Sequence, residues 1–117
     1  MKAAVEFALT PTRRAALRRL YGLEESDLLA LLDIVDHRCP VCLRPFKAAR
    51  VPCVDHAHDT GLIFGPLDQR CNLDLFGVFG RDPEFYERAA AFLRHPPAAR
   101  LPGPRRRVPD SAPVTKG

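Results

Sequence analysis

Three short motifs organise the sequence: Cys39-Pro-Val-Cys42, Asp55-His-Ala-His58 and Asp68-Gln-Arg-Cys71-Asn72. Proteins bind zinc with thiolates, imidazoles and carboxylates, and they bind hard cations such as Mg²⁺ with carboxylate and amide oxygens. The first and last motifs contribute cysteines, whereas the middle motif contributes an acid and two histidines. We therefore expect one metal site that stabilises the fold and a second site that carries out chemistry.

Three of the four cysteines have the spacing of zinc ligands. Two residues separate Cys39 from Cys42, so both thiolates can bind one tetrahedral ion, and 28 residues separate Cys42 from Cys71. A redox Cys-x-x-Cys pair and unliganded buried thiols are the other interpretations. We favour zinc.

The fourth zinc ligand is open. The residue three before Cys71 is Asp68, where a second Cys-x-x-Cys pair would have a cysteine. A carboxylate carries the same charge as a thiolate and is a known zinc ligand. Asp68 is therefore our first choice, with Cys53 or His37 as alternatives.

The middle motif has the residues of a hydrolytic site. A neutral His56 can take a proton from water near neutral pH, and Asp55 offers a carboxylate to a divalent cation. On a strand, His56 and His58 share a face only if the strand continues to residue 58. Alone this motif is also typical of a polar loop, so its weight comes from the cysteines on either side.

Local patterns predict an α+β fold. Thr10-Pro11 and Asp82-Pro83 each combine an N-cap with a proline at the first helical position, and Gly22 is placed to end the first helix. We expect Gly65-Pro66 to end the second strand. The predicted elements are helices over 12–21, 25–35, 67–78 and 82–95, and strands over 50–56 and 62–64 that form a hairpin.

Composition divides the chain into residues 1–24 with a basic helix, residues 25–95 with the three motifs, and residues 96–117. The last part has six prolines and few large apolar residues, so we expect it to be disordered. It holds the whole net charge of +4, so attraction for a nucleic acid must come from this tail or from local patches. The arginines of the first predicted helix either contact phosphates or face water: Arg13, Arg14, Arg18 and Arg19.

The sequence has no apolar run of the roughly 18 residues that a membrane-spanning helix needs. The first residues have a short apolar run that Glu6 interrupts, so we expect no secretory signal. Without export, paired cysteines indicate a metal site or a redox pair rather than structural disulfides. We therefore expect a cytoplasmic protein that has no membrane partner.

Together the motifs resemble the recombination endonuclease VII family, a branch of the HNH or His-Me finger nucleases of phages and actinobacteria. The resemblance rests on Cys-x-x-Cys, Val54-Asp-His-x-His-x-Thr-Gly61 and the final Cys-Asn, and it spans roughly residues 20–93. It implies a zinc-stapled ββα-metal core flanked by helices. Cys39, Cys42 and Cys71 match the cysteines that bind the structural zinc.

The resemblance also implies a catalytic site. Asp55 and Asn72 match the ligands of a catalytic Mg²⁺ or Mn²⁺, and His56 matches the general base that activates water. His58 matches a second histidine that supports catalysis. The implied function is a metal-dependent DNA endonuclease that hydrolyses phosphodiester bonds in branched or mismatched DNA, such as Holliday junctions. Family members often act as dimers within phage-infected or bacterial cells, and no small-molecule substrate is expected.

Two positions depart from the family pattern. Phe64 stands where the family has an arginine that suits a phosphate contact, and Asp68 stands where it has a zinc cysteine. The matched catalytic residues are all retained, so we favour an active or weakened enzyme. The alternative is a zinc-stabilised DNA-binding module whose nuclease activity has lapsed, with affinity supplied by residues 105–107. A redox or interaction protein that uses the paired cysteines is a third interpretation.

Overall fold

We describe a computed structural model of the chain over residues 9–47, 52–73 and 82–109. The first helix, α1, spans Pro11–Tyr21. The Thr10 hydroxyl accepts a hydrogen bond from the backbone N–H of Arg13, and the helix ends at Gly22 with φ at 67°. A left-handed residue at this place favours glycine, which has no Cβ to clash. The prediction of this helix and of both ends is confirmed.

The second helix, α2, spans Glu25–Ile34 and supplies much of the core. Glu24 caps it in a reciprocal capping box with Asp27. Leu28, Leu31 and Leu32 are buried, whereas Leu29 is exposed. Two α1 arginines pair with acids at the start of this helix, at 2.7 Å for Arg18–Glu24 and 3.7 Å for Arg14–Glu25.

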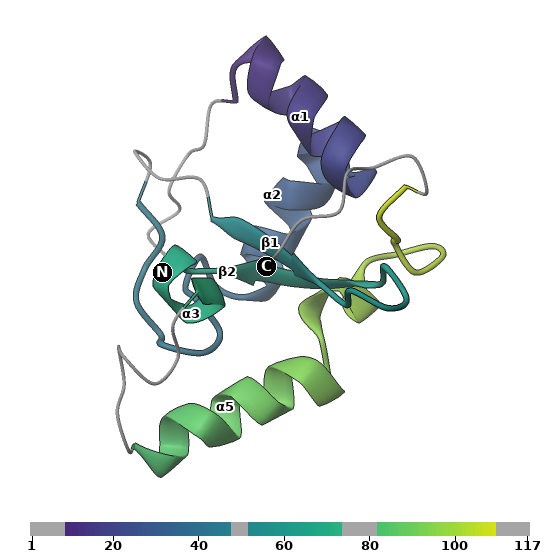
Figure 1. Cartoon of the computed structure of the whole chain (residues 1–117). Coiled ribbons are helices and arrows are strands. Elements are labelled where there is room, and N and C mark those ends of the chain that lie inside the picture. Colours follow the sequence, from purple (N-terminus) through teal and green to yellow (C-terminus); the bar gives the residue numbers. More distant parts are fainter. Residues whose placement is uncertain (1–8, 48–51, 74–81, 110–117) are drawn as a thin grey trace.

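A two-stranded antiparallel hairpin lies at the centre of the fold (Figure 1). Strand β1 spans Cys53–His56 and strand β2 spans Ile63–Leu67. The prediction that Gly65-Pro66 would end the second strand is wrong, since Gly65 pairs with Asp55 and Pro66 pairs with Val54. Each strand has one hydrogen-bonded neighbour, and a strand with a free edge tolerates a proline that cannot donate.

The ladder contains a β-bulge that the sequence did not predict. Asp55 pairs with Gly65, but His56 pairs with Ile63, so Phe64 is the extra residue on β2. Its ring packs edge-on against Phe92, with the ring centroids 6.1 Å apart. A bulge bends and twists a strand locally and changes the direction of nearby side chains. Here it falls at the register step between Asp55 and His56.

Two further helices follow the hairpin. Helix α3 spans Gln69–Leu73, so the predicted helix 67–78 begins two residues late and its second half lies outside the described residues. Helix α5 spans Pro83–Arg94 and is capped by the Asp82 side chain, as predicted. Phe85 and Phe92 of α5 are buried in the core, whereas Leu93 is exposed.

The segment that follows α5 is ordered up to residue 109, so the prediction of disorder from Pro96 is wrong for residues 96–109. Pro97–Arg100 form a 3-10 helix, η1, that packs against β2 and α2. Ala98 and Leu101 are buried. The prolines fix φ and so lower the entropy cost of ordering a segment with few apolar residues. Residues 110–117 lie outside the described part of the chain.

The three consecutive arginines of this segment make contacts within the fold. Arg105 donates to the carbonyl of Ile63, and Arg106 lies 3.1 Å from the Asp27 carboxylate. Arg107 pairs with Leu62 in an isolated bridge. The segment therefore adds to the free edge of β2, and the positive charges assigned to a disordered tail sit on the folded surface.

The elements form a small α+β fold, as predicted. Figure 1 shows α1 and α5 on opposite sides of the hairpin, α3 beside one end of it, and the C-terminal segment along its other end. The buried core joins α2, β2 and α5, and its largest fully buried side chains include Leu31, Ile63 and Phe85. Within the described residues, no helix has the length and apolarity to cross a membrane.

Candidate functional site

Three cysteines from distant parts of the chain lie close together, two in the loop after α2 and one on α3. The Sγ atoms of Cys39, Cys42 and Cys71 all lie within 4.8 Å of one another. Cys39 and Cys71 are buried, and Cys42 is half-buried. Thiolates at this separation can share one tetrahedral ion, so the cluster can hold a structural metal such as zinc. The three cysteines singled out by their spacing are therefore brought together.

Hydrogen bonds favour the thiolate form of one cysteine in this cluster, which is the form that binds a metal. The Sγ atoms of Cys39 and Cys71 are hydrogen-bonded to each other at 3.6 Å. That hydrogen bond, together with backbone N–H groups, outweighs burial and lowers the pKa of Cys39 to about 6. The same hydrogen bond and burial raise the pKa of Cys71. A thiolate is the form that binds a metal, so the surroundings of Cys39 favour a ligand state near neutral pH.

The described residues place none of the three candidate fourth ligands in this group of Sγ atoms. The Asp68 carboxylate accepts a hydrogen bond from the backbone N–H of Arg70 at the start of α3. His37 is buried, with Nε2 3.0 Å from Asp33 and no hydrogen-bond partner for Nδ1 within the described structure. Cys53 is half-buried on β1. Asp68 as a ligand stays a prediction.

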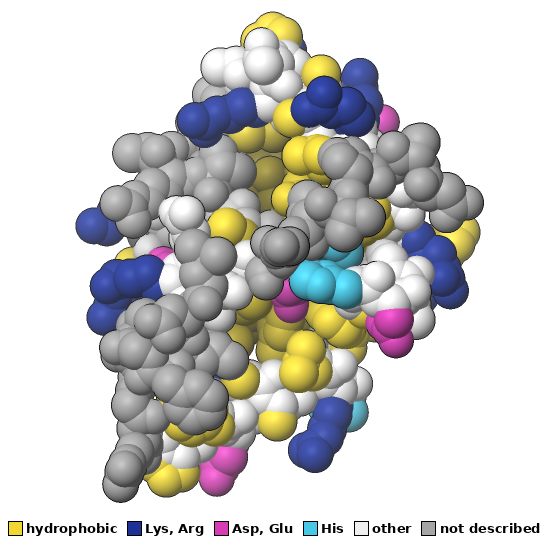
Figure 2. All heavy atoms as spheres, viewed as in Figure 1, with side chains coloured by type: hydrophobic (Ala, Val, Ile, Leu, Met, Phe, Trp, Pro, Cys, Tyr) yellow, Lys and Arg dark blue, Asp and Glu magenta, His cyan; other side chains and the backbone are white. Residues whose placement is uncertain are grey.

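Strand β1 ends in the residues expected to do chemistry. Asp55 and His56 are both half-buried, and β1 ends at His56. His58 lies in the turn that follows, yet its ring centroid is 5.3 Å from that of His56. The two histidines are therefore neighbours although the strand does not continue to residue 58. Figure 2 shows histidine side chains on this face of the hairpin, beside an acidic side chain.

The pKa shifts of these two groups follow from their partial burial. Burial raises the pKa of Asp55, against the opposing effect of the two neighbouring histidines. Burial and then the charge of His58 lower the pKa of His56, and Asp55 acts in the opposite sense. His56 therefore stays neutral, and able to accept a proton, to a lower pH than an exposed histidine.

Asn72 lies on α3, and α3 packs against β1. It is half-buried, and its backbone N–H donates to the carbonyl of Asp68 at 3.1 Å. Asn72 directly follows Cys71, so the cysteine cluster fixes the part of α3 that carries it. The strand that carries Asp55 and His56 is thus in contact with the helix that carries Cys71 and Asn72.

Sequence reasoning missed a contact to His56. Tyr21, the last residue of α1, has its ring edge-on to His56 with the centroids 6.0 Å apart. Burial raises the pKa of Tyr21, and the nearby Cys53 raises it further. The helical pattern marked Tyr21 only as part of an apolar face, and nothing local in the sequence links it to a residue 35 positions later.

The fold and the site define a small α+β protein that has a cluster of three cysteines and a hairpin with an Asp-His pair. The chain belongs to the recombination endonuclease VII family, whose model matches residues 14–95. The match begins inside α1 and ends just after α5, so it covers all three motifs.

Two curated phage proteins are also similar to this chain. The Gene 59 protein of Mycobacterium phage D29 is 35% identical over 85 residues, and that of Mycobacterium phage L5 is 34% identical over 85 residues. In both cases the match covers 73% of this chain and 52% of the relative. The chain thus spans about half the length of these relatives. No solved structure matches it significantly.

Proposed function

We propose that this protein is a metal-dependent endonuclease that hydrolyses phosphodiester bonds in DNA, with branched or distorted DNA as the preferred substrate. One observation carries the proposal. In a chain of the recombination endonuclease VII family, an Asp-His pair ends β1 opposite the bulge of β2, and β1 packs against the short helix bearing Asn72. Contact between a hairpin strand and a short helix supports the proposal of an HNH, or His-Me finger, nuclease.

The described residues support distinct roles. His56 acts as the general base, because its lowered pKa keeps the imidazole neutral and able to take a proton from water. Tyr21 and His58 flank its ring and limit its movement. Asp55 and Asn72 offer the carboxylate and amide oxygens that would hold a Mg²⁺ or Mn²⁺ ion. When bound, such an ion stabilises the negative charge that develops on the phosphate.

The cysteine cluster serves the fold rather than the reaction. A zinc ion held by Cys39, Cys42 and Cys71 would tie the loop after α2 to α3, and through α3 it would fix Asn72. We assign Asp68 as the fourth ligand. To bind the ion, the Asp68 side chain would rotate away from the backbone N–H of Arg70, from which it now accepts a hydrogen bond.

Replacing Asp68 by asparagine tests this assignment. Asparagine caps a helix about as well as aspartate, so the start of α3 should keep its hydrogen bond while the charged ligand is lost. We expect a lower zinc affinity, measured by competition with a chromophoric chelator. Asp68→Cys should restore the affinity or raise it. An unchanged zinc affinity in Asp68→Asn would instead leave Cys53 and His37 as the candidates.

The partner that the proposal requires is DNA, and we further propose that the active form is a homodimer inside phage-infected or bacterial cells. A zinc-stabilised DNA-binding module without nuclease activity is the competing function. Purified protein incubated with branched and supercoiled DNA in Mg²⁺ or Mn²⁺ separates the two. The proposal predicts cleavage products that EDTA suppresses, whereas DNA binding without product in either metal would establish the competing function.

A further inference from the structure

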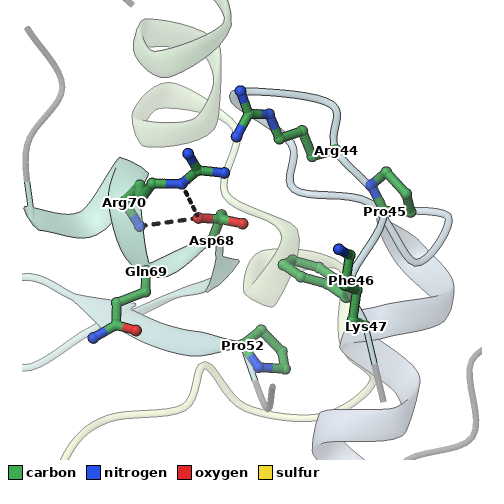
Figure 3. A pocket seen from close by; sticks show the side chains of 8 residues that line it. All are labelled: Arg44, Pro45, Phe46, Lys47, Pro52, Asp68, Gln69 and Arg70. Atoms are coloured by element: carbon green, nitrogen blue, oxygen red, sulfur yellow. Dashed lines mark hydrogen bonds and ion pairs between the residues drawn. The ribbon is translucent and has the colours of Figure 1, made fainter. Parts of the chain in front are cut away.

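A polar depression lies beside the cysteine cluster, at the opposite end of β1 from His56. It has a volume of about 660 Å³ and lies between the loop that follows Cys42 and the start of α3. Figure 3 shows Arg44 on the loop side and Arg70 on the α3 side, with Asp68 between them. Of the residues that line it, only Asp68 has a role assigned above.

Its rim is strongly basic. Arg44, Lys47 and Arg70 line it, and all three are exposed. Asp68 is the acid in its lining and lies 3.9 Å from Arg70, a loose pair that leaves the guanidinium free to donate elsewhere. Among the ion pairs of the described residues, none uses Arg44 or Lys47. The rim therefore carries a local excess of positive charge.

The floor is apolar, which narrows the kind of ligand. Phe46 and Pro52 line the depression and are buried. A basic rim over an apolar floor suits a ligand that has anionic groups on one side and apolar groups on the other. A nucleic-acid strand has this character, because guanidinium groups bind its phosphates and apolar side chains contact its sugars and bases.

The clustered cysteines also position the backbone of the two arginines on this rim. The backbone N–H of Cys39 donates to the Arg44 carbonyl at 2.9 Å, and the backbone N–H of Arg44 donates to the Cys42 sulfur. Arg70 directly precedes Cys71. Both arginines are thus held within two residues of a clustered thiol, on backbone that a bound metal would make rigid.

The distance between the depression and His56 allows one DNA strand to contact both. His56 lies four positions after Pro52 along the strand direction, which is roughly 13 Å at about 3.3 Å per residue. At about 3.4 Å per nucleotide of B-form DNA, that distance corresponds to roughly four nucleotides. We propose that Arg44, Lys47 and Arg70 bind a backbone phosphate of the DNA strand a few nucleotides from the bond that is cut. This inference rests on the proposed function and locates its substrate.

Charge removal at the rim tests the inference. The double variant Arg44→Gln/Arg70→Gln should weaken binding to a labelled duplex roughly tenfold or more, measured by fluorescence anisotropy without added divalent cation. The slope of log Kd against log salt concentration should fall by about 0.9 for each lost contact. Arg94→Gln, which changes an exposed arginine on α5, is the matched control and should alter neither quantity.

An affinity and a salt slope equal to those of the wild type in the double variant would overturn the inference. Zinc content and thermal unfolding measured on the same samples check the fold, and if the double variant is unfolded, the single variants Arg44→Gln and Lys47→Gln replace it, with a slope change of about 0.9 each. Cleavage by the wild type is scored separately. If the wild type cleaves DNA but its DNA affinity does not depend on the rim arginines, only this inference is contradicted. If the DNA affinity depends on them but no cleavage occurs, only the proposed nuclease activity is contradicted.

Discussion

Replacing His56 by alanine is expected to lower the rate of DNA cleavage by roughly 10² to 10⁴-fold, which is the range for loss of a general acid or base. His56 ends β1 at the bulge, its ring is flanked by Tyr21 and His58, and its pKa is lowered chiefly by burial. The variant lacks the imidazole that we propose takes the proton from the attacking water. DNA binding in Mg²⁺ should change little, because His56 contributes no fixed charge at neutral pH.

The matched control is His95→Ala. His95 is an exposed histidine that follows the last residue of α5, so its loss should leave cleavage unchanged. Rates are compared under single-turnover conditions on the same branched DNA, with thermal unfolding to check the fold. Equal cleavage by His56→Ala and the wild type would remove His56 from the mechanism.

Replacing Cys39 by serine is expected to remove the bound zinc and with it the cooperative fold. Structural zinc contributes about 10–16 kcal/mol in zinc-finger peptides, whereas a whole domain is stable by only about 5–15 kcal/mol. Cys39 is buried, and its Sγ atom lies within 4.8 Å of the Sγ atoms of Cys42 and Cys71. We expect the thermal transition to broaden or disappear, together with the near-UV circular dichroism signal.

Cys53→Ser is the control for this variant, since Cys53 is a half-buried cysteine on β1 outside the cluster. It should keep its zinc and most of its stability. Zinc content is measured by mass spectrometry of the intact protein. A Cys39→Ser protein with full zinc content and a wild-type transition would contradict the assigned metal site, and zinc loss from Cys53→Ser would add Cys53 as the fourth ligand.

The helices could be predicted from the sequence because their ends depend on local chemistry. Thr10-Pro11, Gly22 and Asp82-Pro83 specify caps within a few residues of the bonds they make, and the structure confirms them. The three clustered cysteines were also predicted, because tetrahedral coordination constrains their spacing. The caps involve only the residues of one motif, whereas the cysteine cluster joins two motifs whose ligand chemistry is recognisable in the sequence.

Features that depend on distant contacts could not be predicted. Gly65-Pro66 normally interrupts a strand, but here η1 covers the backbone, and the Gly65 Cα region faces Pro97 so closely that an added Cβ would lie 3.2 Å from its ring. The order of residues 96–109 has the same origin. Arg106 reaches Asp27 and Arg105 reaches Ile63, partners that composition alone does not reveal.

The reassignment of the arginine triplet changes where DNA binding is expected. Arg105 and Arg106 hold the C-terminal segment to the hairpin and to α2, so they are partly engaged within the fold. The depression beside α3 offers a basic rim in which Arg44 and Lys47 take part in no ion pair of the described residues. Electrostatic attraction then acts close to the proposed active site rather than through a disordered tail.

The central claim is that a zinc-supported Asp-His hairpin cleaves DNA with the help of a second, divalent ion. The most direct test measures zinc content and cleavage of branched DNA on one preparation of the full chain, in Mg²⁺ and in Mn²⁺, beside His56→Ala. We predict about one zinc per chain and cleavage products that require the added metal and vanish in the variant. Zinc-containing protein that binds the DNA and yields no product in either metal would contradict the claim.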